Sequence, residues 1–277
     1  MSDNWIVENL LHAFETWNQR LAEIWELVAQ TPQTFKGGGV WSVILDINGG
    51  LKAIGYGLLV LFAAMSIFGS TANFRDFKRP EYALRHFIRF VAAKIAVTYC
   101  MDIMTTIFGI CGGVVSSVAA KVGGMTAATA TLPDEIVRAI ENTGFFASIP
   151  LWIVSLLGSL FITALSFIMI MTVYARFFRL YMYTAFAPLP LASFAGEGTS
   201  SHGKAFIKNY IGVCMEGAVI VLACLIFSAF ASGTPSITGE TAFVQVFGYL
   251  AETVFNMLIL VGLVKASDRI TKELFGL

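Results

Sequence analysis

Four ionisable residues lie inside long apolar runs of this 277-residue chain: Lys94, Asp102, Glu216 and Glu252. A charge at the centre of a bilayer costs at least about 2.5 to 3.5 kcal/mol, so such residues pair, face water or carry function. Counted from the cytoplasmic ends of their predicted spans, Lys94 and Glu216 lie at similar depths on different helices, which allows them to pair. Asp102 and Glu252 fall near mid-membrane, where they share a proton or face water. All four serve either as polar contacts between helices or as the lining of a substrate path.

No catalytic constellation accompanies these charges. The sequence offers no nucleophile–base pair, zinc spacing or phosphate loop that supports an enzyme. The cysteines lack CxxC spacing and neighbouring histidines, so we interpret them as small buried hydrophobic residues: Cys100, Cys111, Cys214 and Cys224. We therefore expect no enzyme activity, no cofactor and no metal site.

The composition predicts an integral membrane protein. Hydrophobic residues make up 57% and charged residues 13% of the chain, and the mean hydropathy is +0.75. Soluble domains are about 45 to 50% apolar. A bilayer core about 30 Å thick needs roughly 20 apolar residues per helix. The fold class is therefore all-α, a polytopic membrane helical bundle with about five transmembrane helices, at about 51–70, 91–118, 150–174, 209–231 and 243–264.

The N-terminal region differs from these spans. Residues 4–28 place apolar side chains at helical spacing with charged residues between them, which predicts an amphipathic helix lying on a surface. Three glycines at 37–39 then form a joint. We divide the chain into an extracytoplasmic N-terminal helix, 1–36, and a transmembrane domain, 37–277. Residues 40–50 are interrupted by Asp46, Asn48 and two glycines, which predicts a re-entrant or interfacial turn.

A proline-containing segment, 180–195, is apolar but short for a span and is kinked by Pro188 and Pro190. It is either a re-entrant or interfacial segment, or an apolar hairpin packed on a partner. Crossing as a sixth span would place Lys204, Lys208 and the basic tail outside, which is the poorer charge arrangement.

The basic residues indicate sidedness. With five spans, 12 of the 18 Lys and Arg residues lie inside, four outside and two within spans. The predicted topology has the N-terminus outside and the C-terminus in the cytoplasm. The cytoplasmic basic residues are candidate contacts for a partner or the anionic leaflet, although topology alone explains most of them: Arg75, Lys78, Arg79, Arg85, Arg89, Arg176, Arg179, Lys204 and Lys208.

Several short stretches, taken in order over nearly the whole chain, resemble the TrbL-like conjugal transfer proteins of Gram-positive conjugative elements. None is a catalytic signature. The stretches are Thr31–Phe35 with the following glycines and Trp41, Arg79–Glu81, Leu132–Ile136, Ser148–Trp152, Phe167–Tyr174, Ala187–Pro190, Ser193–Glu197 and Ser267–Arg269.

The resemblance implies a membrane platform or channel subunit of a conjugative type IV secretion system. Such a subunit works as a homo-oligomer beside the system's ATPases and coupling protein, helping to move a relaxase-bound single DNA strand or a protein. Transient contact with single-stranded DNA or relaxase stays open, because basic loops serve topology and nucleic acid equally well. The main alternative is a secondary transporter or ion-coupled carrier, although no internal repeat is visible. A membrane-embedded enzyme comes third.

Overall fold

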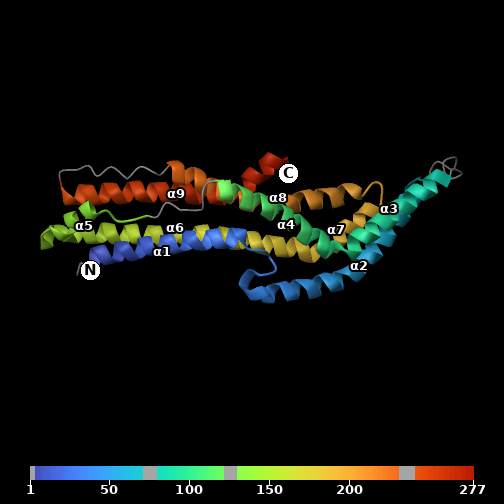
Figure 1. The fold of residues 1–277 in the computed structure, drawn as a ribbon, viewed down its shortest axis with the longest axis horizontal. Helices are drawn as coiled ribbons and strands as arrows, with labels where there is room; N and C mark the ends of the chain where they lie inside the picture. Colours follow the sequence, from blue (N-terminus) through green and yellow to red (C-terminus); the bar gives the residue numbers. More distant parts are fainter. Residues whose placement is uncertain (1–3, 71–79, 122–129, 231–240) are drawn as a thin grey trace. The chain divides into compact units, whose positions relative to one another are not determined.

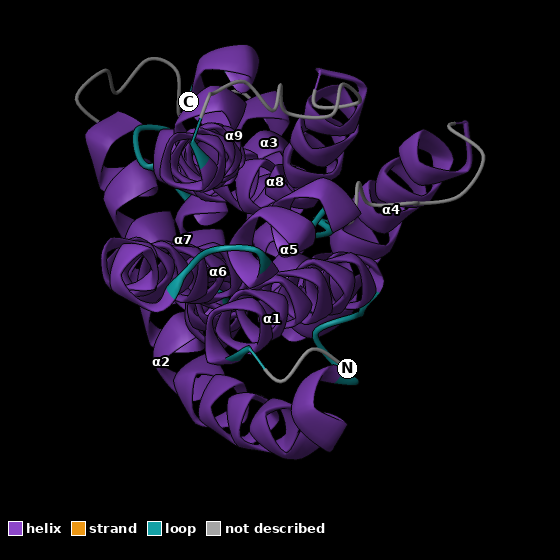
Figure 2. Cartoon of the chain, turned by 90° about the vertical axis from the view of Figure 1, so that its left-hand side faces the viewer, coloured by secondary structure: helices purple, strands orange, loops and turns teal. Residues whose placement is uncertain are grey.

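The computed structural model describes residues 4–70, 80–121, 130–230 and 241–277, and the regular elements in these ranges are all helical (Figures 1 and 2). Five stretches within them are long and apolar enough to cross a membrane, which confirms the all-α prediction with five candidate spans. The elements are α1 (Trp5–Ala29), η1 (Phe35–Gly38), α2 (Gly39–Ser70), α3 (Pro80–Thr98), α4 (Cys100–Lys121), α5 (Asp134–Glu141), α6 (Phe145–Phe186), α7 (Pro188–Ala192), η3 (Ser193–Ala195), α8 (Ser200–Phe230) and α9 (Ala242–Phe275).

The chain forms two compact units, each assembled from three separate stretches of sequence. The first unit contains Met1–Ala29, Val115–Ala175 and Ala218–Ser267. The second unit contains Gln30–Val114, Arg176–Gly217 and Asp268–Leu277. Helices α4, α6, α8 and α9 therefore contribute residues to both units.

In the first unit, α1 packs along α6 with both helices running in the same direction. The Trp5 and Trp152 ring centroids lie 5.8 Å apart. Further along, Asn9 donates to Ser159 Oγ at 2.9 Å, and the Tyr174 hydroxyl donates to Glu23 at 2.9 Å. The amphipathic α1 is confirmed as a helix, and its apolar face is buried. Helix α6 of the same unit supplies part of the surface that this face covers.

The segment before α5 is held by polar side chains of α1 and α9. The Asn18 side chain donates to Ala130 O and accepts from Ala130 N, each at 2.9 Å. The Tyr249 hydroxyl donates to Thr131 O at 2.6 Å. Pro133 then occupies the N-cap position of α5.

In the second unit, α2 lies along the end of α6 and then along α7 and η3. Phe35 stacks on Phe177 with 4.1 Å between centroids, and Asn48 donates to Thr184 O at 2.8 Å. The glycine joint adopts left-handed backbone angles, with φ of 74° at Gly37 and 79° at Gly38. The turn predicted over 40–50 is wrong, because α2 is helical from Gly39 onward.

Two helix breaks distinguish the second unit. The predicted span 91–118 is divided between α3 and α4, which meet at Tyr99. Helix α6 runs on to Phe186, 12 residues beyond the predicted end of the third span, and stops where Pro188 begins α7. The short α7 and η3 pack against α2 and α3. The prolines therefore end one helix and start another within a packed region.

Candidate functional site

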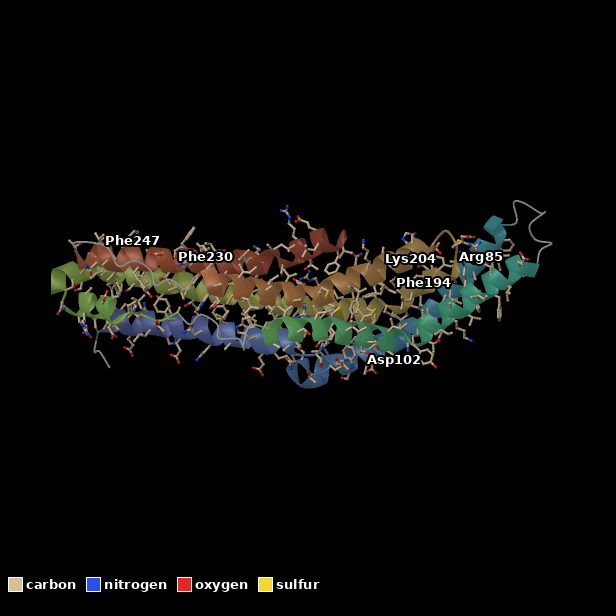
Figure 3. All side chains as sticks on the ribbon, turned by 45° about the horizontal axis from the view of Figure 1, so that its top comes forward. Arg85, Asp102, Phe194, Lys204, Phe230 and Phe247 are labelled. Carbon is tan, nitrogen blue, oxygen red and sulfur yellow. The ribbon has the colours of Figure 1, made fainter. Side chains whose placement is uncertain are left out.

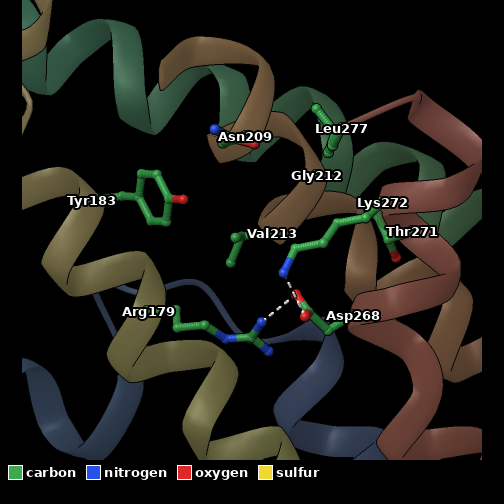
Figure 4. Close-up of a pocket in the computed structure, with 9 residues that line it drawn as sticks. All are labelled: Arg179, Tyr183, Asn209, Gly212, Val213, Asp268, Thr271, Lys272 and Leu277. Atoms are coloured by element: carbon green, nitrogen blue, oxygen red, sulfur yellow. Dashed lines mark hydrogen bonds and ion pairs between the residues drawn. The ribbon is translucent and has the colours of Figure 1, made fainter. Parts of the chain in front are cut away.

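A network of charged side chains joins α6, α8 and α9 in the second unit. The Arg179 guanidinium donates to both Glu216 carboxylate oxygens at 2.7 Å. The same guanidinium donates to Asp268 Oδ1 at 2.5 Å. Lys272, one turn after Asp268 on α9, donates to its other oxygen at 2.8 Å (Figure 4). One arginine thus bridges two carboxylates from different helices, a geometry that its planar group favours.

Arg176 lies one turn before Arg179 and is almost completely buried, at 1% exposure. Its guanidinium donates to Val213 O at 3.4 Å and Cys214 O at 3.2 Å on α8. The rings of Phe108 and Phe177 lie 5.9 and 5.8 Å from its central carbon. Carbonyl oxygens and aromatic faces are both favourable surroundings for a desolvated arginine.

A glycine on α8 makes room for this guanidinium. A Cβ added at Gly217 would come within 2.8 Å of three guanidinium atoms of Arg176. The surrounding helices run antiparallel, since Tyr183 contacts Phe206 and Tyr210 while Arg176 reaches Cys214. Close packing of α6 on α8 therefore depends on both a small residue and a buried charge.

A small cavity of about 70 Å³ lies beside the network, enough for about two water molecules. Arg179, Asp268 and Lys272 line it together with polar and apolar side chains (Figure 4). The charged groups of this lining are two positive and one negative. The described residues include no group of three or more potential metal ligands. The ion pairs beside the cavity hold α6, α8 and α9 together.

A second charge cluster is exposed and connects the turn after η3 to α3. The Glu197 carboxylate lies 3.1 Å from Arg89 and 3.4 Å from Arg85. The Glu197 backbone N–H donates to Ser66 Oγ of α2 at 3.1 Å. The hydrogen bond from Arg89 lowers the pKa of the Glu197 carboxyl below its ordinary value. This cluster fastens the turn after η3 to two helices.

The structure changes the expected pairing of the intramembrane charges. Glu216 is bound by Arg179, so the expected Lys94–Glu216 pair is wrong. Lys94 and Asp102 are exposed on α3 and α4 (Figure 3 labels Asp102), and Glu252 is exposed on α9. Asp102 and Glu252 belong to different units.

The basic candidates separate into buried, exposed and undescribed groups. Arg176 is buried, so it is not available as the surface contact that we expected. Arg85 and Lys204 are exposed (Figure 3), and Lys208 donates to Gly276 O at 2.7 Å. Arg89 and Arg179 are held in the two ion-pair clusters described above. Three further predicted contacts lie outside the described residues: Arg75, Lys78 and Arg79.

Sequence reasoning missed several polar residues of the second unit. Asp268 and Lys272 have the i, i+4 spacing of a helical ion pair, which was the available signal. Lys52 was visible as a lysine inside an apolar run. Asn48 was interpreted as a helix-breaking residue, whereas it is buried and hydrogen-bonded within α2.

Comparison with known proteins gives one family. A family model described as TrbL/VirB6 plasmid conjugal transfer like protein matches residues 17–188, more than half of the chain. This range contains α1 from Trp17 and all of α2 to α6. No curated protein and no solved structure matches the chain.

Proposed function

Because the chain belongs to the TrbL/VirB6 plasmid conjugal transfer-like family, we propose that it is a platform or channel subunit that helps move a DNA–relaxase complex or a protein across the cell membrane. Family membership makes it a multi-pass membrane subunit of a conjugal type IV secretion system. Proteins of this family are membrane secretion components and not enzymes. The match over residues 17–188 is the observation that carries the proposal.

We also propose that the N-terminus lies outside and the C-terminus in the cytoplasm. The distribution of basic residues supports this orientation, since the loops and tail assigned to the cytoplasm hold most of them. Exposed Arg85 and Lys204 would then lie on the cytoplasmic side, where the system's ATPases and coupling protein act. Anionic lipid headgroups would meet the same residues.

Assembly as a homo-oligomer belongs to the same proposal. Large apolar side chains are exposed along α6, among them Trp152, Leu160 and Phe167. Lipid or a second copy would cover such a surface in the membrane. The resemblance of the short sequence stretches supports a secretion system of the Gram-positive conjugative-element type. Transient contact of this subunit with single-stranded DNA or relaxase is also part of the proposal.

The test is the conjugation frequency after clean deletion of the gene from its element. Complementation with the wild type should restore transfer, and Glu216→Gln should restore it poorly because Arg179 loses a buried partner. Lys94→Ala, at an exposed lysine of α3, should restore it fully. Unchanged transfer after deletion would overturn the proposal.

A secondary transporter is the second candidate, and the two helix breaks favour it. Discontinuous helices beside polar side chains occur at the substrate sites of transporters. Here α3 breaks from α4 at Tyr99, and α6 breaks from α7 before Pro188. A transporter would move solute when purified and reconstituted in liposomes, whereas a secretion subunit alone would be inert.

A further inference from the structure

One face of α2 carries hydrogen-bonding side chains one turn apart. Asn48, Lys52 and Tyr56 are separated by four residues each, so they lie on the same side of the helix. All three fall in the apolar stretch Phe35–Gly69, one of the candidate membrane spans. Polar and charged groups inside such a span are costly, so their partners are informative.

Lys52 reaches the break between α3 and α4. Its ammonium donates to the backbone carbonyl of Thr98, the last residue of α3, at 3.0 Å. The Tyr56 hydroxyl also lies 3.0 Å from Thr98 Oγ1. The last carbonyl groups of a helix lack intrahelical donors and carry partial negative charge, so a cation stabilises them. Lys52 supplies that cation from a different helix.

Asn48 holds the second break and connects it to the first. Pro188 has no N–H, so Thr184 O loses the donor that would come four residues later. The Asn48 side chain supplies the missing donor at 2.8 Å. Its own oxygen accepts from the Cys100 thiol, on the first residue of α4, at 3.3 Å. One turn of α2 therefore serves both breaks.

The two breaks also share close packing against α2. A Cβ at Gly55 would lie 3.0 Å from Pro188 O, so the missing side chain lets α7 approach. Helix α3 packs on α2, α7 and η3, and through Arg89 it reaches Glu197. The direction of α3 after its break thus depends on contacts made by α2.

We propose that Lys52 is a positioning residue, whose ammonium fixes the α3–α4 break and so the direction in which α3 presents Arg85 and Arg89. The consequence for transfer rests on the proposed function. Lys94 provides a matched comparison, since it is a lysine on α3 whose side chain is exposed. Both lysines lie inside apolar runs of the sequence. We assign them different roles because the Lys52 ammonium donates to the last carbonyl group of α3, whereas the Lys94 side chain is exposed.

Hydrogen exchange of the full-length protein in lipid nanodiscs tests the structural claim. Lys52→Met should speed exchange of the amides at 98–103 by about tenfold, because the ion-assisted hydrogen bond at the break is lost. Lys52→Arg keeps a cationic donor and should exchange within about threefold of the wild type. Lys94→Met should match the wild type. Unchanged exchange in Lys52→Met would overturn the proposal. If that variant does not accumulate, Lys52→Leu removes the donor in the same way.

Conjugation measured with the same variants tests the consequence for transfer. Lys52→Met, present in the membrane at the wild-type level, should lower transfer by about tenfold, and Lys52→Arg should restore it. Faster exchange with normal transfer would overturn the link between the break and transfer. If deletion of the whole gene leaves transfer unchanged, the proposed function fails, while the exchange result still decides the role of Lys52.

Discussion

Two clusters in the second unit share the same central set of charged residues and have very different surroundings. Each contains two arginines on one helix and a glutamate from elsewhere: Arg176 and Arg179 with Glu216, and Arg85 and Arg89 with Glu197. The Glu216 side chain is 1% exposed, whereas the Glu197 side chain is 51% exposed. The contacts are also shorter in the buried cluster, at 2.7 Å against 3.1 and 3.4 Å.

The difference teaches that burial, and not charge type, decides what each cluster does. Removing one member of a buried pair leaves an uncompensated charge, which is strongly destabilising. Exposed pairs contribute about 0 to 1 kcal/mol, because water already solvates both members. We therefore interpret the buried cluster as a fixed structural joint. The exposed cluster keeps its arginines accessible to an acidic partner or lipid.

The largest expected effect is loss of the buried carboxylate. Glu216→Gln should lower the free energy of unfolding by about 3 kcal/mol or more, because Arg179 and Arg176 lose a buried negative charge. The matched Glu197→Gln should cost at most about 1 kcal/mol. Thermal unfolding in detergent measures both. Equal losses for the two variants would show that burial does not separate the clusters.

A glycine substitution tests how tightly the buried cluster is packed. Gly217→Ala should cost about 1 to 3 kcal/mol, because the new Cβ would lie 2.8 Å from a guanidinium held by two carbonyl oxygens and two rings. Gly262→Ala on α9 is the control, since nothing lies within 4 Å of its added Cβ. The control should be neutral or stabilising by up to about 1 kcal/mol. A stable Gly217→Ala protein would mean that the guanidinium shifts freely.

The elements that the sequence predicted correctly were those with a local signal. The amphipathic spacing of α1 and the three glycines after α1 each act within a few residues. The turn predicted over 40–50 was wrong because Asn48 and two glycines were interpreted as breaking the helix. In the structure, hydrogen bonds and packing against α6 and α7 support a continuous α2.

The partners of the charged residues were beyond reach of the sequence. Depth along a span suggested Lys94 for Glu216, but pairing also depends on how each helix is rotated and which neighbour it faces. Arg179 faces Glu216, while the Lys94 side chain is exposed. The break at Tyr99 has no proline or glycine to indicate it, so only the three-dimensional contacts reveal it.

Acidification should weaken the exposed cluster selectively. The Arg89 hydrogen bond lowers the pKa of Glu197 below its ordinary 4.5, so the pair is present at full strength above that value. It is lost as the pH falls through the lowered pKa, when the carboxylate is protonated. Hydrogen exchange of residues 193–200, measured from pH 6 to 3.5 and corrected for intrinsic rates, should rise only below about pH 4.5. Glu197→Gln should remove this pH dependence, and a change near neutral pH would contradict the assignment.

The smallest expected effect separates the two arginines of the exposed cluster. Arg89 is 29% exposed and lies 3.1 Å from Glu197, whereas Arg85 is 56% exposed and lies 3.4 Å away. Arg89→Ala should cost at most about 1 kcal/mol of unfolding free energy and Arg85→Ala less than about 0.5 kcal/mol. Both losses should shrink in 1 M salt, where the Debye length is about 3 Å. If Arg85 serves a partner, Arg85→Ala will lower transfer while leaving thermal unfolding unchanged. A larger stability loss for Arg85→Ala than for Arg89→Ala would instead assign Arg85 to the fold, and the exposed cluster would then resemble the buried one.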